Sequence, residues 1–199
     1  MNQNSVVWLR ISGTFGILAP IVAFVLISLA IVYSPQFSWS QNALSDLGVQ
    51  EGITPVLFNY GLITVGIFAL VFASGLFIFL KDRTLGRVGA LMFVLASLAL
   101  TAIGVFPENM KPMHFQASVA FFVLYPLATL VIATAFLLTK DVKMGLFTFG
   151  AAAVAAVVWI AYFATMFVPG VAIPEAISAV SAGVWAIVSG FRMLKKART

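Results

Sequence analysis

The sequence predicts an all-α, polytopic membrane protein in which a bundle of six transmembrane helices crosses the bilayer. Of its 199 residues, 62% are hydrophobic and only 9% are charged, whereas about 25% of the residues of an average soluble domain are charged. The apolar residues also form six long runs, and a helix of about 20 apolar residues is enough to cross the hydrocarbon core. So few charged residues could not cover the surface of a soluble fold. We therefore expect residues 1–199 to form a single transmembrane domain.

The apolar runs place the six helices in order along the chain, at about residues 11–34, 55–80, 86–106, 114–138, 144–168 and 172–191. The first run exceeds the core of a signal peptide, which has about 7–15 residues, so we expect it to be retained. The second follows a long loop, residues 34–54, and stops before Lys81. The third begins beside Arg87 and stops before Pro107. The fourth begins at His114, the fifth follows Lys143, and the sixth ends at the basic tail. All are continuous, unlike the short alternating strands of a membrane barrel.

Lysine and arginine residues predict the orientation of the bundle. If the N-terminus is cytoplasmic, ten of the eleven basic residues lie in the cytoplasm and only Lys111 lies outside. Because cytoplasmic loops carry an excess of Lys and Arg, we expect both termini to be cytoplasmic, in a cell membrane. The tail "RMLKKART", residues 192–199, is expected to contact anionic headgroups. The net charge of +5 therefore gives no reason to expect nucleic acid as a partner.

The acidic residues are concentrated on the opposite side. Four of the six acids and the only histidine fall at the outer helix ends or in the outer loops: Asp46, Glu51, Glu108, Glu175 and His114. This segregation of polar groups to one side of the membrane predicts an outward-facing polar site.

Three outer segments supply the candidate residues, and the first is "SWSQNALSDLG", residues 38–48. Asn42, Ser45 and Asp46 are spaced i, i+3 and i+4, so they would share one face of a short helix. They form either one wall of the site or merely the caps of a local turn.

The second segment is "FPENMKPMHF", residues 106–115. Glu108 belongs either to the site or to a surface ion pair with Lys111. His114 begins an apolar helix, with Ser118 one turn below it on the same face. Such a histidine is either an interfacial anchor or part of a site, since ionisable groups at membrane depth are costly and tend to be functional.

The third segment is "VPGVAIPEAIS", residues 168–178, in which Glu175 follows Pro174 near the start of the last helix. An acidic residue there is favoured by the helix dipole. The alternative is that Glu175 points inward as a partner of His114 or Ser45.

Together these segments resemble the prokaryotic membrane family called domain of unknown function 998. The similar motifs are "LSDLG", "GVFPENMKPMH" and "IPEAISAVSAGVW", and the resemblance extends from about residue 11 to 192. It implies that one site contains Ser45, Asp46, Gly48, Pro107, His114 and Glu175. A basic residue often follows the last acid in such proteins, whereas this chain has Ala176. The chain is also distantly similar to Frag1/DRAM/Sfk1-type six-helix membrane proteins, some of which work in lipid or glycolipid remodelling.

We therefore expect an outward-facing site at the outer ends of the first, third, fourth and sixth helices that binds a lipid or a small polar ligand. Its candidate residues are Asn42, Ser45, Asp46, Glu108, His114 and Glu175. The alternative is a membrane-embedded hydrolase or transferase acting on a lipid or headgroup, with Ser45 as nucleophile, His114 as base, and Asp46, Glu108 or Glu175 orienting the base. Whether the protein is an enzyme is left open.

The donor set also bears on cofactors and partners. With one histidine and no cysteine, the sequence predicts no metal site and no cofactor. The alternative is that the histidine and the carboxylates together hold a hard or borderline metal ion. Membrane lipids are the expected partners. Association with a second copy, or with a larger membrane complex, is left open.

Overall fold

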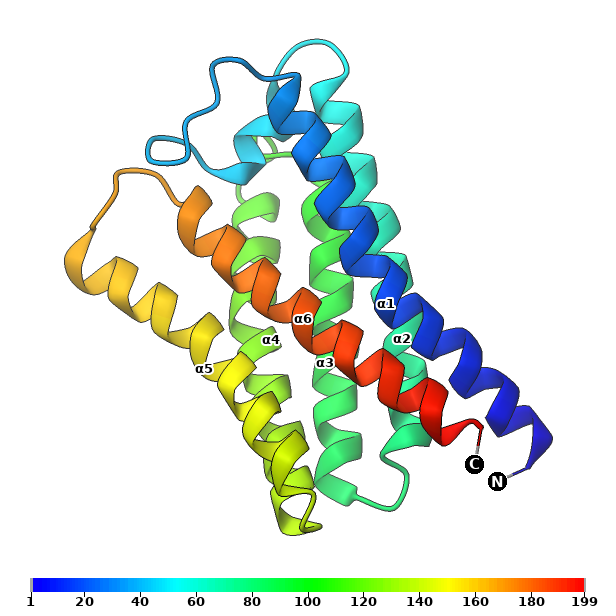
Figure 1. The fold of residues 1–199 in the computed structure, drawn as a ribbon. Coiled ribbons are helices and arrows are strands. Elements are labelled where there is room, and N and C mark those ends of the chain that lie inside the picture. The colour runs from blue at the N-terminus through cyan, green and yellow to red at the C-terminus, as the bar shows by residue number, and fades with distance from the viewer. Residues whose placement is uncertain (1, 199) are drawn as a thin grey trace.

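The structure is a computed structural model that describes residues 2–198. Six long helices run up and down through it, and both termini lie at the same end (Figure 1). The elements are α1 (Gln3–Val32), η1 (Leu44–Val49), η2 (Val56–Tyr60), α2 (Gly61–Phe79), α3 (Thr84–Val105), α4 (Met113–Leu138), α5 (Val142–Thr165) and α6 (Ala172–Lys196). η1 is a 3₁₀-helix, and η2 is a short π-helix that leads directly into α2. No strand occurs within residues 2–198.

All six long helices are long and apolar enough to cross a membrane. The predicted all-α fold with six transmembrane helices is therefore confirmed, and the chain is a multi-pass membrane protein. The helix ends differ from prediction at three places. α1 begins at Gln3 rather than near residue 11 because the Asn2 side chain caps it, accepting a hydrogen bond from the Ser5 N–H at 2.9 Å. α5 stops at Thr165 because Met166 takes a left-handed conformation, with φ of 45°, and α6 continues through the basic residues to Lys196.

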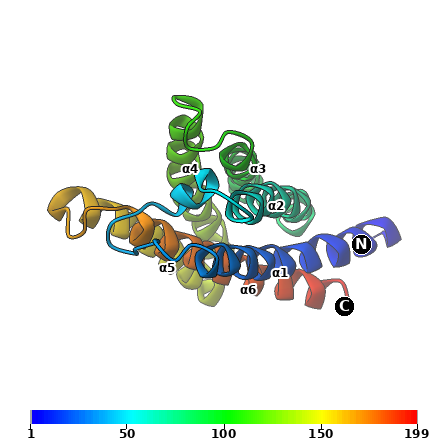
Figure 2. The same ribbon diagram turned by 90° about the horizontal axis from the view of Figure 1, so that it is seen from above.

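The helices form two layers, α2, α3 and α4 in one and α1, α6 and α5 in the other (Figure 2). Each helix packs against the next in sequence, and α6 returns to pack against α1. At the terminus end α1 and α6 approach closely through two glycines, and a Cβ added to Gly13 would lie 2.9 Å from the Gly190 carbonyl oxygen. Toward the opposite end the two helices diverge (Figure 1).

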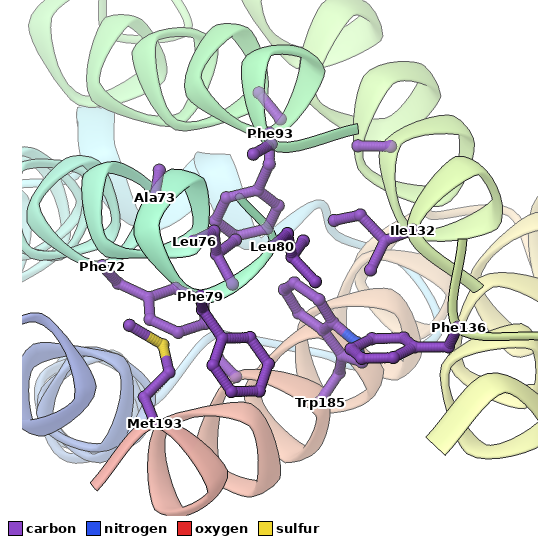
Figure 3. Packing of buried hydrophobic residues seen from close by; sticks show 14 of the residues in the cluster. Phe72, Ala73, Leu76, Phe79, Leu80, Phe93, Ile132, Phe136, Trp185 and Met193 are labelled. Atoms are coloured by element: carbon purple, nitrogen blue, oxygen red, sulfur yellow. The ribbon is translucent and has the colours of Figure 1, made fainter. Parts of the chain in front are cut away.

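Aromatic side chains from α2, α3, α4 and α6 fill the core between the layers (Figure 3). The rings of Phe72, Phe93 and Trp185 meet with centroids 5.1–5.8 Å apart. The indole N–H of Trp185 donates to the Thr148 hydroxyl at 3.2 Å, which satisfies a polar atom that would otherwise be buried in the core.

A second apolar cluster lies at the end opposite the termini. Leu44 and Leu47 of η1 are buried there together with Phe58 of η2 and Leu62 of α2. The burial of the two leucines draws η1 down onto the helix ends. This end of the bundle, with its connections 33–55, 106–112 and 166–171, is called the site end below.

Candidate functional site

The loop before η1 is fastened to the start of α6 by main-chain hydrogen bonds. The N–H of Gly170 donates to the Ser40 carbonyl at 2.8 Å, and that of Ala172 donates to the Asn42 carbonyl at 2.9 Å. On the other side of η1, the Asn59 amide donates to the Gly48 carbonyl at 2.8 Å. η1 is thus held between α6 and η2.

Asn42 and Asp46 shape the turn that leads into η1. Asp46 Oδ2 accepts hydrogen bonds from the Asn42 side-chain amide at 2.7 Å and from the Ala43 N–H at 2.9 Å. Asn42 Oδ1 in turn accepts from the Ser38 N–H at 2.9 Å. Asn42 and Asp46 therefore cap a local turn, which was the alternative to their forming one wall of the site.

Glu175 joins α6 to η1. Its side chain is buried, with 9% exposed, and Oε2 accepts a hydrogen bond from the Leu44 N–H at 2.7 Å. The second oxygen, Oε1, accepts none from the described residues. Glu175 therefore pairs with neither His114 nor Ser45 but with the main chain, and it keeps a free acceptor.

Ser45 joins η1 to the connection between α3 and α4. Its hydroxyl, on a residue only 7% exposed, donates to Glu108 Oε2 at 3.3 Å. Glu108 forms no ion pair with Lys111; the ion pair found within residues 2–198 joins Arg192 to Asp141 at the terminus end.

The surroundings of Glu108 favour its protonated form. Burial raises the pKa of Glu108, and the nearby Asp46 carboxylate raises it further through a hydrogen bond and charge repulsion. The Ser45 hydroxyl and His114 act in the opposite direction and are outweighed. Two carboxyl groups, Asp46 and Glu108, therefore lie together beside Ser45.

His114 begins α4 and is also buried, with 7% exposed. Its Nδ1 lies 2.7 Å from the Phe106 carbonyl oxygen. A carbonyl only accepts, so Nδ1 carries the hydrogen of this hydrogen bond. Within residues 2–198 His114 makes no hydrogen bond to Ser45, Asp46, Glu108 or Glu175, although it is close enough to Glu108 to interact electrostatically.

A cavity of about 60 Å³ lies beneath η1. Its polar lining comes from Ser45, Glu175 and Ser118, and the rest of its wall is apolar, including Ile27, Phe58 and Phe121. Two of the six candidate residues thus face the cavity. The other four do not line it: Asn42 and Asp46 shape the turn before η1, Glu108 lies in the connection between α3 and α4, and His114 lies at the start of α4.

Several hydrogen-bond partners at this site could not be predicted from the sequence. The Leu44 N–H and the Phe106 and Gly48 carbonyls are main-chain groups, so no side-chain pattern marks them. Asn59 is the one missed side chain, and a polar residue at the start of an apolar run was its only signal. The part of the chain that the structure describes holds no group of three or more His, Asp or Glu residues placed to bind a metal ion.

The fold and this site define a multi-pass membrane protein with a small, largely apolar cavity, lined in part by Ser45 and Glu175, at one end of a six-helix bundle. The family model for a protein of unknown function, DUF998, matches residues 17–192, and the chain belongs to this family. The resemblance inferred from the three motifs is thereby confirmed. No curated protein and no solved structure matches the chain, and the more distant likeness to Frag1/DRAM/Sfk1-type proteins has no support in these comparisons.

Proposed function

We propose that this protein binds a lipid or a small polar ligand in an outward-facing polar site at the site end of the bundle. One observation carries the proposal: Ser45 and Glu175 are buried, yet both face a cavity whose remaining wall is largely apolar. Glu175 Oε2 is already bonded to the Leu44 N–H, and Oε1 is an acceptor with no donor among the described residues. A ligand with hydrogen-bond donors would find an acceptor there.

The orientation belongs to the same proposal. The terminus end carries ten of the eleven basic residues, and an excess of Lys and Arg marks the cytoplasmic side. Both termini are then cytoplasmic, the protein lies in the cell membrane, and the cavity lies at the depth of the outer leaflet.

The alternative function is hydrolysis or group transfer on a lipid or headgroup. It would need Ser45 and His114 within hydrogen-bond reach of each other, so that the imidazole takes the hydroxyl proton. Ser45 instead donates to Glu108, and within residues 2–198 no hydrogen bond joins Ser45 to His114. This pairing of Ser45 supports binding over catalysis.

Mass spectrometry of the intact protein, released from detergent after purification from its membrane, tests the proposal. The wild type is expected to retain a bound molecule, and Glu175→Gln and Ser45→Ala are each expected to lose it. Glu51→Gln is the matched control, because Glu51 is an exposed acid at the same end. Equal retention in all four proteins, or no retained molecule in the wild type, would refute the proposal. Ser45→Ala keeps the test valid if Glu175→Gln does not fold.

A further inference from the structure

A second and larger cavity lies between α1 and α6, where the two helices diverge toward the site end. Its volume is about 550 Å³. Apart from Ser28 its lining is apolar or aromatic, and includes Pro20, Phe24, Ile31, Trp39, Val180 and Val184. Phe24, Val180 and Val184 are also exposed on membrane-spanning helices, so the cavity opens toward the hydrocarbon of the bilayer. We call it the α1/α6 groove.

The groove shares a wall with the cavity beneath η1. Ile27, Leu44 and Ala179 line both spaces. The main-chain N–H of Leu44 is also the donor to Glu175. An apolar groove at membrane depth therefore ends beside a buried carboxylate.

We propose that the α1/α6 groove holds one hydrocarbon chain of a lipid whose head carries a protonated amine, and that this amine binds at Glu175. This inference rests on the proposed function and names the class of ligand.

The length of the groove indicates a lipid chain rather than a partner helix. Along α6 the lining runs from Ala176 to Ile187, eleven residue steps or about 16 Å at the helical rise of about 1.5 Å. This is about half of the hydrocarbon core of about 30 Å, the depth of one leaflet. Beyond it α1 and α6 close on each other at Gly13 and Gly190. A transmembrane helix of a partner would need a groove along the full span, whereas an acyl chain of one leaflet needs half.

The charges at the head of the groove indicate the amine. Asp46 and Glu108 are close enough to Glu175 to interact with it electrostatically, and a cation placed among these carboxyl groups would relieve the repulsion that opposes their ionisation. Lys111 is the only basic residue in the site-end connections, and it is exposed. Glu175 Oε1 has no donor within the described residues. An ammonium group supplies both the positive charge and the donors, whereas an anionic head without an amine would be repelled.

Quenching of Trp39 fluorescence by brominated lipids tests the inference, because Trp39 lines the groove. The purified protein in detergent is titrated with phosphatidylethanolamine or phosphatidylglycerol brominated near the carbonyl end of one acyl chain. Subtracting the signal of Trp39→Phe isolates the contribution of Trp39. We expect saturable quenching, with phosphatidylethanolamine binding at least about tenfold more tightly, as a hydrogen bond to a charged group would give.

Two variants separate the groove from the head site. Val180→Phe with Val184→Phe narrows the groove and should abolish the saturable quenching. The control is Val157→Phe with Val154→Phe on α5, whose valines match them in exposure, at 59% and 49%. Glu175→Gln should retain quenching but lose most of the preference for the amine.

Each outcome decides a part of the inference. Equal binding of the two lipids by the wild type would overturn the amine head. Quenching that survives narrowing of the groove, or is absent in the wild type, would overturn the groove as the chain site. If either failure occurs while intact-protein mass spectrometry still shows a ligand that depends on Glu175, the proposed function stands and only this inference falls.

Discussion

Replacing His114 with alanine should destabilise the protein far more than replacing Lys111, three residues before it. His114 is buried and donates to the Phe106 carbonyl at 2.7 Å, whereas Lys111 is exposed. The Phe106 carbonyl is partly buried, so leaving it without its donor should cost an amount toward the lower end of about 1–3 kcal/mol. The volume vacated by the ring adds to this, so the total loss should be at least about 2 kcal/mol. Lys111→Ala should change stability by no more than about 0.5 kcal/mol, as expected for an exposed site.

Reversible unfolding by dodecyl sulfate in mixed micelles measures the free energies of unfolding directly. His114→Asn is the informative second variant, because its side-chain amide keeps a donor near the position of Nδ1. It should recover more than half of the loss seen in His114→Ala. If His114→Ala lies within about 0.5 kcal/mol of Lys111→Ala, the hydrogen bond to Phe106 does not hold α4 to the end of α3, and this account of the site is wrong.

Three further predictions follow from the same structure. Because the pKa of Glu108 is raised in the folded protein, the contribution of Glu108 to stability is present below the ordinary pKa of glutamate and is lost as the pH rises through the raised value. Glu108→Gln should flatten this part of a curve of unfolding free energy against pH. An unchanged curve would contradict the raised pKa of Glu108. The natural chain has no cysteine, so Asn109→Cys should react with a membrane-impermeant maleimide on whole cells while Lys143→Cys should not, and the reverse pattern would invert the proposed orientation. Gly13→Leu should lower the free energy of unfolding by about 1–3 kcal/mol through overpacking, since even a Cβ there would lie 2.9 Å from the Gly190 carbonyl oxygen; melting like that of the wild type would show that α1 and α6 separate freely.

The fold was predictable because one physical requirement, about 20 apolar residues per crossing, is visible in any hydrophobic run. The errors arose where another interaction decided a helix end. Asn2 caps α1 with its side chain and extends the helix well before the apolar run, and the left-handed Met166 ends α5 while the sequence is still apolar. Hydrophobicity reports where a helix crosses a membrane, whereas capping decides where it begins and ends.

The candidate site was predictable in its residue types and its end of the bundle, but not in its pairings. Glu175 was considered as a partner of His114 or Ser45, yet its hydrogen-bond partner is the Leu44 N–H. His114 likewise bonds to a carbonyl, that of Phe106. Every residue except proline carries the same main-chain donor and acceptor, so no sequence pattern distinguishes the ones that a fold will use.

The α1/α6 groove was invisible in the sequence for a related reason. Valine and phenylalanine residues line the groove, and the same residue types face lipid elsewhere on the same helices. Residue type therefore does not separate the two sets. What distinguishes them is the divergence of α1 from α6 beyond their close contact at Gly13 and Gly190 (Figure 1). Leu44 of η1 lines both the groove and the cavity beneath η1, and its N–H donates to Glu175, so the hydrogen bond that fastens η1 to α6 also places one wall of the groove. The polar site and the groove are therefore consequences of one packing arrangement, which is why a ligand that uses both is the simplest occupant.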